Sequence, residues 1–271
     1  MEKKLLELNE DNYYSTQANI DYMSVSQWKD FAKCELYGKM KALGEYVEPK
    51  SKALLMGSYA DSYFSNRMEK FIQENPDIFK KDGTLKSDYE KANECISKAT
   101  SSEFFMEHIK GQTQVIVTGE IEGVPWKGCY DFLNERITDL KLVASIRELV
   151  WKYDPNTKRN YQTNFIDAYG YDIQGAVYQY LGEQFFGKHM PFDIGAISKE
   201  DEPDIAIINI DDDILANKLE EVKKNTVRYD LIKKGVIEPN RCGNCPVCRK
   251  YNRLDRVITY KEMFDKGEEN E

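Results

Sequence analysis

The stretch that decides the fold is residues 128–141, GCYDFLNERITDLK, in which two runs of β-forming residues flank three turn residues, Asn134–Arg136. This pattern predicts an antiparallel hairpin with a three-residue loop. In that register Asp131 lies directly opposite Asp139. Facing residues of an antiparallel pair have Cβ atoms about 5 Å apart. Two carboxylates held this close repel one another, so the hairpin predicts a cation between them.

Lys141 adds an ammonium group to the same face, because it follows Asp139 by two positions along the strand. Mg²⁺ prefers oxygen ligands, and an ammonium beside a bound phosphate can neutralise its charge or orient an attacking water. This hairpin face therefore carries the minimum set for metal-assisted hydrolysis of a phosphodiester. The alternative is a solvated face with a salt bridge, since acid-x-Lys triplets also begin at Glu2, Glu48 and Glu221.

Hydrophobic periodicity on either side of the hairpin predicts an α/β (α+β) fold, with a central mixed sheet flanked by helices. We expect one domain, 1–271, with a mainly helical part (1–110), a sheet core (111–210), and a long helix with a Cys-rich tail (211–271). One expected helix begins at Ser24, and four others cover 51–68, 88–101, 171–185 and 212–234. The expected strands cover 114–118, 124–133, 137–142, 194–198 and 205–210.

Composition limits the classes of function. The 271 residues carry a net charge of −9 and a mean hydropathy of −0.65, and no stretch approaches the roughly 20 apolar residues of a membrane span. The N-terminus lacks the apolar segment of a secretory signal, so we expect a soluble cytoplasmic protein with no membrane partner. The acidic charge argues against broad coating of nucleic acid.

The region 218–256 is locally basic, with 11 Lys or Arg against 5 Asp or Glu, a difference of +6. Basic side chains are the usual contacts to a phosphate backbone. The candidates for guiding a DNA strand are Lys158, Arg159, Lys223, Lys224 and Arg228.

From about Ser24 to Arg249 the chain resembles the PD-(D/E)XK nucleases. Asp131, Asp139 and Lys141 match the acidic residues and the lysine of that motif, although Tyr130 stands where the family name has proline. The resemblance implies a restriction-endonuclease-like core that uses Mg²⁺ or Mn²⁺. It also implies that the backbone carbonyl of Leu140 is a metal ligand.

Two further family motifs have counterparts. Gln174 and Tyr178 match the family's Gln-x-x-x-Tyr, whose side chains share one helix face and contact DNA or brace the site. The family's Gly-x-x-x-His appears here as Gly57-x-x-x-Asp61, which implies Asp61 as a hard metal ligand in place of histidine. His108 lies in no recognisable motif and is expected to be structural.

Six cysteines include Cys242, Cys245 and Cys248, a run that offers three thiolates where zinc and iron–sulfur sites use four. Resemblance to the AddB-like branch of the family implies Cys34 as the fourth. The spacing favours a [4Fe–4S] cluster, with zinc or no metal as the alternatives. Cys129, outside this set, is expected in the core.

Within the family the chain is most similar to RecE-like (exonuclease VIII-like) enzymes. This resemblance implies a metal-dependent exonuclease that digests linear duplex DNA from 5′ ends in phage-type recombination. It also implies a RecT-like annealing protein as partner and a homo-oligomeric state. One alternative is an AddB-type iron–sulfur nuclease acting on single-stranded ends. Another is a catalytically inactive DNA-binding module of the same fold.

Overall fold

The computed structural model describes residues 4–154, 157, 159–253, 256–260 and 262. Its helices are α1 (Thr16–Asp21), α2 (Val25–Lys33), α3 (Glu35–Ala42), α4 (Lys52–Phe64), α5 (Met68–Glu74), the 3₁₀ helix η1 (Pro76–Ile78), α6 (Ser87–Thr100), α7 (Glu103–His108), α8 (Phe165–Tyr169), α9 (Tyr171–Phe186), α10 (Asp212–Lys233) and α11 (Pro246–Lys250). Its strands are β1 (Gln112–Ile121), β2 (Val124–Leu133), β3 (Ile137–Val143), β4 (Val150–Asp154), β5 (Arg159–Thr163), β6 (Phe192–Ser198) and β7 (Ile205–Asn209).

The central sheet is mixed and has the strand order β1-β2-β3-β6-β7. Strand β3 pairs antiparallel with β2 and parallel with β6, while β1–β2 and β6–β7 are antiparallel. Because β3 lies in the middle, most of its residues are buried, and an acid placed there has little access to solvent. The predicted mixed α+β fold with flanking helices is confirmed.

The β2–β3 hairpin has the predicted register. Phe132 faces Thr138 and Leu133 faces Ile137, so the next facing pair is Asp131 and Asp139. The backbone ladder ends there, because a carboxylate oxygen of Asp131 accepts the N–H of Leu140 at 2.9 Å. The two strands therefore separate at the acidic pair.

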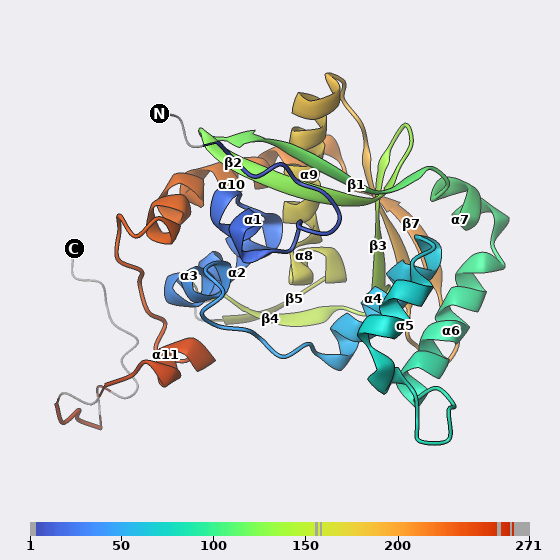
Figure 1. Cartoon of the computed structure of the whole chain (residues 1–271), viewed down its shortest axis with the longest axis horizontal. Helices are drawn as coiled ribbons and strands as arrows, with labels where there is room; N and C mark the ends of the chain where they lie inside the picture. The colour runs from blue at the N-terminus through green and yellow to red at the C-terminus, as the bar shows by residue number, and fades with distance from the viewer. Residues whose placement is uncertain (1–3, 155–156, 158, 254–255, 261, 263–271) are drawn as a thin grey trace.

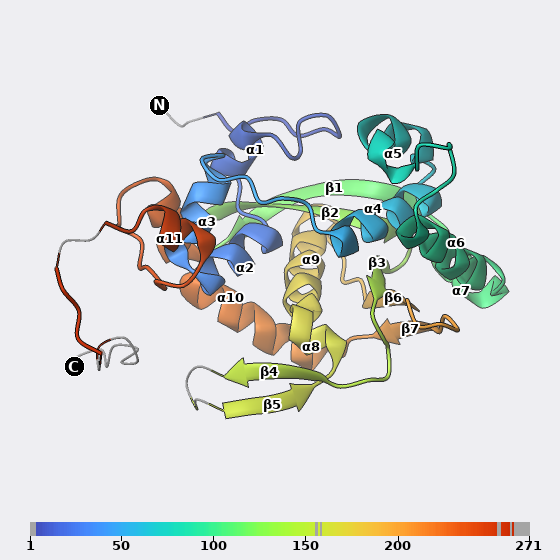
Figure 2. The ribbon, with the colours of Figure 1, turned by 90° about the horizontal axis from the view of Figure 1, so that it is seen from below.

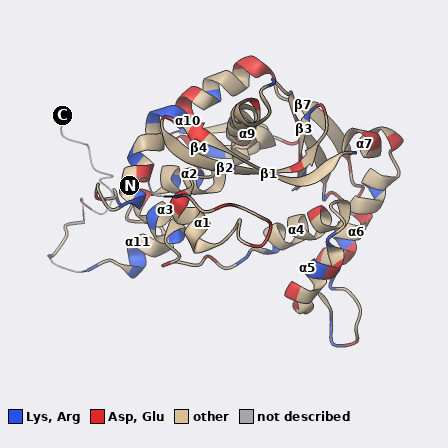
Figure 3. Cartoon of the chain, turned by 45° about the horizontal axis from the view of Figure 1, so that its top comes forward, with Lys and Arg blue, Asp and Glu red and all other residues tan. Residues whose placement is uncertain are grey.

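Helix α9 packs directly on the sheet, and most of the other helices form two groups at opposite ends of the molecule (Figures 1 and 2). Helix α9 packs against β1, β2 and β6, and α10 packs against α9. The N-terminal helices α1–α3 gather with α10 and α11 at one end of the molecule, and α4–α7 gather at the other. Acidic and basic residues alternate along α6 and α10 (Figure 3), so the outer helices carry both charges.

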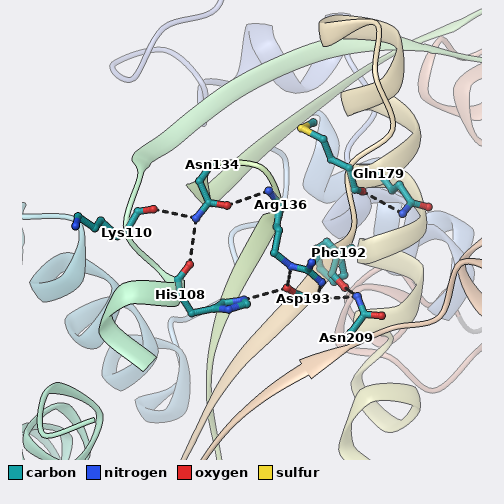
Figure 4. A network of polar contacts seen from close by, with 9 residues as sticks. His108, Lys110, Asn134, Arg136, Gln179, Phe192, Asp193 and Asn209 are labelled. Atoms are coloured by element: carbon teal, nitrogen blue, oxygen red, sulfur yellow. Dashed lines mark hydrogen bonds and ion pairs between the residues drawn. The ribbon is translucent and has the colours of Figure 1, made fainter. Parts of the chain in front are cut away.

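A polar network holds the β2–β3 turn in place (Figure 4). The guanidinium of Arg136 pairs with the fully buried carboxylate of Asp193 on β6, which also contacts His108 at 2.9 Å and Asn209 at 2.7 Å. The side chain of Asn134 donates to the carbonyl of His108 at 3.2 Å. The turn that sets the register is thus linked to β6, β7 and α7. His108 contributes to this network and does not line the described cavity.

Several elements of the structure have no individual counterpart in the prediction. These are the short helices α1, α3, α7, α8 and α11, and strands β4 and β5, which form a separate two-stranded hairpin. The hairpin is largely polar and exposes Trp151, so it carries no clear apolar face from which to predict strands. The expected helix 51–68 also ends earlier, at Phe64, and α5 begins at Met68. In the described part of the chain, no helix combines the length and apolar character needed to cross a membrane.

Candidate active site and metal centre

A cavity of about 980 Å³ opens where the acidic pair separates β2 from β3. Helices α2, α4 and α9 and strands β1 to β3 contribute to its walls. The cavity brings together the catalytic and metal-binding residues expected from the sequence: Asp61, Asp131, Asp139, Leu140, Lys141, Gln174 and Tyr178. Residues separated by more than 100 positions thus share one surface.

Asp139 is the most buried acid of this set, with 1% of its surface exposed. One carboxylate oxygen accepts a hydrogen bond from Gln174 at 2.7 Å. The other forms a buried ion pair with the ammonium of Lys141. Each carboxylate oxygen can accept from more than one direction, so Asp139 retains the capacity to bind a cation as well.

Gln114 links the other two acids. Its side-chain amide donates to Asp61 at 3.0 Å and to Asp131 at 3.4 Å. Gln114 lies on β1 opposite Asp131 and has a positive φ of 55°, which is uncommon for a residue with a side chain. The guanidinium of Arg67 also contacts Asp61 at 2.9 Å. Asp61, from α4, therefore reaches the acidic pair through Gln114.

The cavity floor accumulates negative charge. Burial and the nearby Asp139 and Asp61 raise the pKa of Asp131 well above its usual value. Burial, opposed by Arg67, also raises the pKa of Asp61. A divalent cation would relieve this repulsion. Among the described residues, the cysteine set is the group of three or more such ligands that already lies close enough together to hold an ion, and the three carboxylates do not form such a group. The oxygen donors and the charge fit a hard ion held mainly by two acids.

Lys141 remains charged in this environment. Burial alone would lower its pKa, but Asp139 and Asp131 outweigh burial and raise the pKa above its usual value. Its ammonium also lies 4.9 Å from the ring centroid of Tyr171. The side chain is therefore fixed between a carboxylate and an aromatic face.

Lys29 is a cavity residue that sequence reasoning missed. Its ammonium donates to the carbonyl of Tyr169 at 2.8 Å and lies 5.6 Å from the ring centroid of Tyr171. Burial and the neighbouring Lys141 lower its pKa to about 8. The apolar residues of α2 indicated only which face is buried, and no motif marks Lys29.

Gln174 and Tyr178 lie one turn apart on α9, as the motif implies. Gln174 orients Asp139, whereas the ring of Tyr178 packs 5.0 Å from that of Tyr130. A Cβ at position 128 would lie 3.3 Å from the Tyr178 ring, so Gly128 allows this close approach. The two side chains brace β2 and β3 from the helix side.

The predicted strand-guiding residues do not line the described cavity. Arg159 is exposed on β5, and Lys224 is exposed on α10. Lys223 pairs with Glu220 at 2.7 Å, and Arg228 makes two bonds to Glu35 at 2.6 and 2.8 Å. Lys158 lies outside the described residues.

Four of the cysteines lie close together. The sulfurs of Cys34, Cys242, Cys245 and Cys248 all lie within 4.8 Å of one another. Burial opposes ionisation of Cys242, but backbone N–H groups lower its pKa to about 7. Cys129, expected in the core, is half-buried, lines the cavity and contacts Gln114 at 3.4 Å.

A mixed sheet whose central strands present an acid opposite Asp-x-Lys defines a PD-(D/E)XK-type domain. The chain belongs to the family described as "PDDEXK-like domain of unknown function (DUF3799)", whose model matches residues 24–251. It is also similar to a crystal structure from Eubacterium rectale described as a "putative exonuclease". That similarity has 41% identity and a TM-score of 0.90, and covers 96% of this chain and 99% of the other. No curated protein matches the sequence significantly.

Proposed function

We propose that this chain is a Mg²⁺- or Mn²⁺-dependent deoxyribonuclease that hydrolyses phosphodiester bonds at the ends of linear DNA. The observation that carries this proposal is the meeting of Asp131, Asp139 and Lys141 at the floor of one cavity. The similarity to the structure described as an exonuclease supports it.

Each cavity residue has a role in this proposal. Asp131 and Asp139 would hold the divalent ion, with Asp61 and the Leu140 carbonyl as further ligands. When bound, such an ion supplies charge neutralisation of the phosphate and lowers the pKa of a coordinated water. Gln174 keeps the carboxylate of Asp139 in position.

Lys141 would stabilise the charge that develops on the phosphate and orient the attacking water. A raised pKa favours this donor role over that of a general base, because the side chain holds its proton at neutral pH. Tyr178 would brace the site or contact the DNA backbone.

The finer activity follows from the RecE-like resemblance. We propose digestion of duplex ends with 5′–3′ polarity in phage-type recombination, with a RecT-like annealing protein as partner and a homo-oligomeric assembly. The cysteine set supports one alternative, an AddB-type nuclease acting on single-stranded ends, because that branch supplies the matching cysteine pattern.

The test is digestion of three substrates, each with Mg²⁺ or Mn²⁺: end-labelled linear duplex, covalently closed circle and single strand. The proposal expects loss of linear duplex, release of label from 5′ ends first, and an intact circle. Preference for single strands would favour the AddB-type alternative. Binding of DNA without cleavage would favour an inactive DNA-binding module.

The matched variants are Lys141→Ala and Lys98→Ala, the second an exposed lysine on α6. We expect Lys141→Ala to lower the cleavage rate by about 10²–10³, the usual effect of removing one electrostatic donor. Lys98→Ala should cleave at the normal rate. A Lys141→Ala variant with full activity would contradict the assigned role.

A further inference from the structure

The sulfur–sulfur separations in the cysteine set distinguish between the two kinds of metal centre that four thiolates can form. Cys248 lies 3.6 Å from Cys34 and 3.9 Å from Cys242, measured between sulfurs. These distances exceed the 2.05 Å of a disulfide, and all four residues are free thiols. The four sulfurs therefore surround a small common centre.

One tetrahedral ion fits that centre. Metal–sulfur bonds of about 2.3 Å place the sulfurs of a tetrahedron about 3.8 Å apart. In a [4Fe–4S] cluster each thiolate instead binds a separate iron, and the cluster itself fills the space between the sulfurs. Four sulfurs that all lie within 4.8 Å of one another leave no such space.

The surroundings are those of a bound thiolate site. The backbone N–H of Cys245 donates to the sulfur of Cys242, and the N–H of Cys248 donates to the sulfur of Cys245, both at 3.3 Å. Such donors stabilise negative charge on sulfur. The buried side chains of Val247 and Tyr37 pack against Cys34, Cys245 and Cys248, while Cys242 is exposed.

We infer that the four cysteines bind a single structural Zn²⁺. Four thiolates in a tetrahedron suit this ion, which binds four sulfurs without redox change and leaves no open position. The geometry thus favours the zinc alternative over the iron–sulfur cluster that the cysteine spacing suggested. The inference does not depend on the proposed nuclease activity.

The site joins the active-site wall to the tail of the chain. Cys34 stands between α2 and α3, and five residues before it Lys29 enters the cavity. Cys245 and Cys248 belong to the start of α11 and to its interior. Zinc would therefore fix the helix pair that forms one side of the cavity, without touching the substrate.

The first test is the metal content of the full-length protein purified aerobically and anaerobically. We expect about one zinc per chain, no stoichiometric iron or sulfide, and no visible charge-transfer absorption. Titration with a mercurial reagent should release the zinc in step with modification of four thiols. A brown protein with iron and sulfide, a single bound iron, or four reactive thiols with no metal would overturn the inference.

Variants locate the ion. Cys245→Ser and Cys248→Ser should each lose zinc, while Cys95→Ser should keep it. Cys95 is a matched control because it is a fully buried thiol that instead contacts the carbonyl of Ser198. Zinc retained at full stoichiometry in both cluster variants would place the ion elsewhere and contradict the inference. Should those variants fail to fold, the mercurial titration of the unaltered protein still decides.

Discussion

Asp131 lowers the stability of the folded protein for the sake of the candidate active site. Its carboxylate accepts hydrogen bonds from Leu140 and Gln114, yet burial and the carboxylates of Asp139 and Asp61 disfavour its charge. In the absence of a cation, a group with a raised folded-state pKa destabilises the folded protein increasingly as the pH rises above its unfolded value of about 3.9, and the loss is complete above the folded-state pKa. Functional sites commonly carry this kind of cost.

We therefore expect Asp131→Asn to stabilise the metal-free protein at pH 7 by about 0.5–2 kcal/mol, while cleavage is lost. The difference should shrink as the pH falls toward about 3.9, because below that value the Asp131 carboxyl is protonated in the unfolded chain as well. Thermal unfolding with and without Mg²⁺ provides the measurement. Mg²⁺ should raise the Tm of the unaltered protein and have little effect on the variant. A variant that is less stable at pH 7 would contradict the repulsion described here.

Lys29 is expected to contribute to the pH dependence of cleavage. Its pKa of about 8 means that its positive charge is lost as the pH rises past that value. We expect Lys29→Met to lower the cleavage rate about tenfold at pH 7, the effect of losing roughly 1.4 kcal/mol of phosphate stabilisation. The unaltered enzyme should lose activity above pH 8, whereas the variant should show no such limb in its pH–rate profile. Identical profiles for the two proteins would exclude this role.

At the scale of single residues, the sequence pointed to Asp131, Asp139 and Lys141 because they lie close together on one hairpin, whereas Asp61 on α4 came from the family resemblance. It predicted neither Gln114 nor Lys29. Gln114 matters through a positive φ that no residue pattern marks, and Lys29 matters through the contact of α2 with α8 and α9. Both are consequences of tertiary packing.

Among the elements, the β2–β3 hairpin positions the site, and its turn depends on Asp193. Burial would raise the pKa of this carboxyl, but Arg136, Asn209 and His108 outweigh burial and hold the pKa below its usual range. A lowered folded-state pKa contributes stability that is complete above the unfolded value of about 3.9 and is lost as the pH falls through the folded value.

We expect Asp193→Asn to cost about 2–3 kcal/mol of unfolding free energy at pH 7, because it weakens hydrogen bonds to a charged partner. The two proteins should approach each other in stability below about pH 4, where Asp193 is protonated in the unfolded chain. Denaturant unfolding at several pH values measures this convergence. A constant difference between pH 7 and pH 3 would show that charge at Asp193 is not responsible.

The elements themselves followed their local patterns to different degrees. The hairpin register, α9 and α10 were predictable because turn residues and apolar periodicity agree there. The β4–β5 hairpin was not, because β4 exposes its aromatic residues and β5 is mostly polar and exposed, so neither strand carries an apolar face. The parallel pairing of β3 with β6 joins residues about 55 positions apart, which local periodicity does not specify.

Over the whole molecule, distant segments are joined by a few charged contacts. Arg228 on α10 binds Glu35 at the start of α3, and Glu35 also accepts the N–H of Asn240 at 2.7 Å. The sequence predicted Arg228 as a DNA contact because it lies in a basic region. Its two bonds to Glu35, whose carboxylate is 12% exposed, give Arg228 a structural contact, and its role at DNA stays a prediction.

Arg228→Ala should lower the free energy of unfolding by about 1 kcal/mol, the upper range for a partly exposed pair. Lys224→Ala, at an exposed position of the same helix, should change it by less than about 0.5 kcal/mol. Thermal unfolding and DNA-binding measurements on both variants provide the check. Equal stability combined with weaker DNA binding by Arg228→Ala would contradict the structural role and support the strand-guiding role.

The cysteine set has a consequence for the order in which the protein matures. Ribosomal synthesis produces Cys34 more than 200 residues before Cys242, Cys245 and Cys248. During most of translation the thiol of Cys34 therefore lacks the other three cysteines. The junction of α2 and α3 beside the cavity then lacks its contacts with the C-terminal segment. We therefore expect the α2–α3 side of the cavity to reach its final structure only after the C-terminal cysteines are synthesised. Chains truncated before Cys242 should lack these contacts.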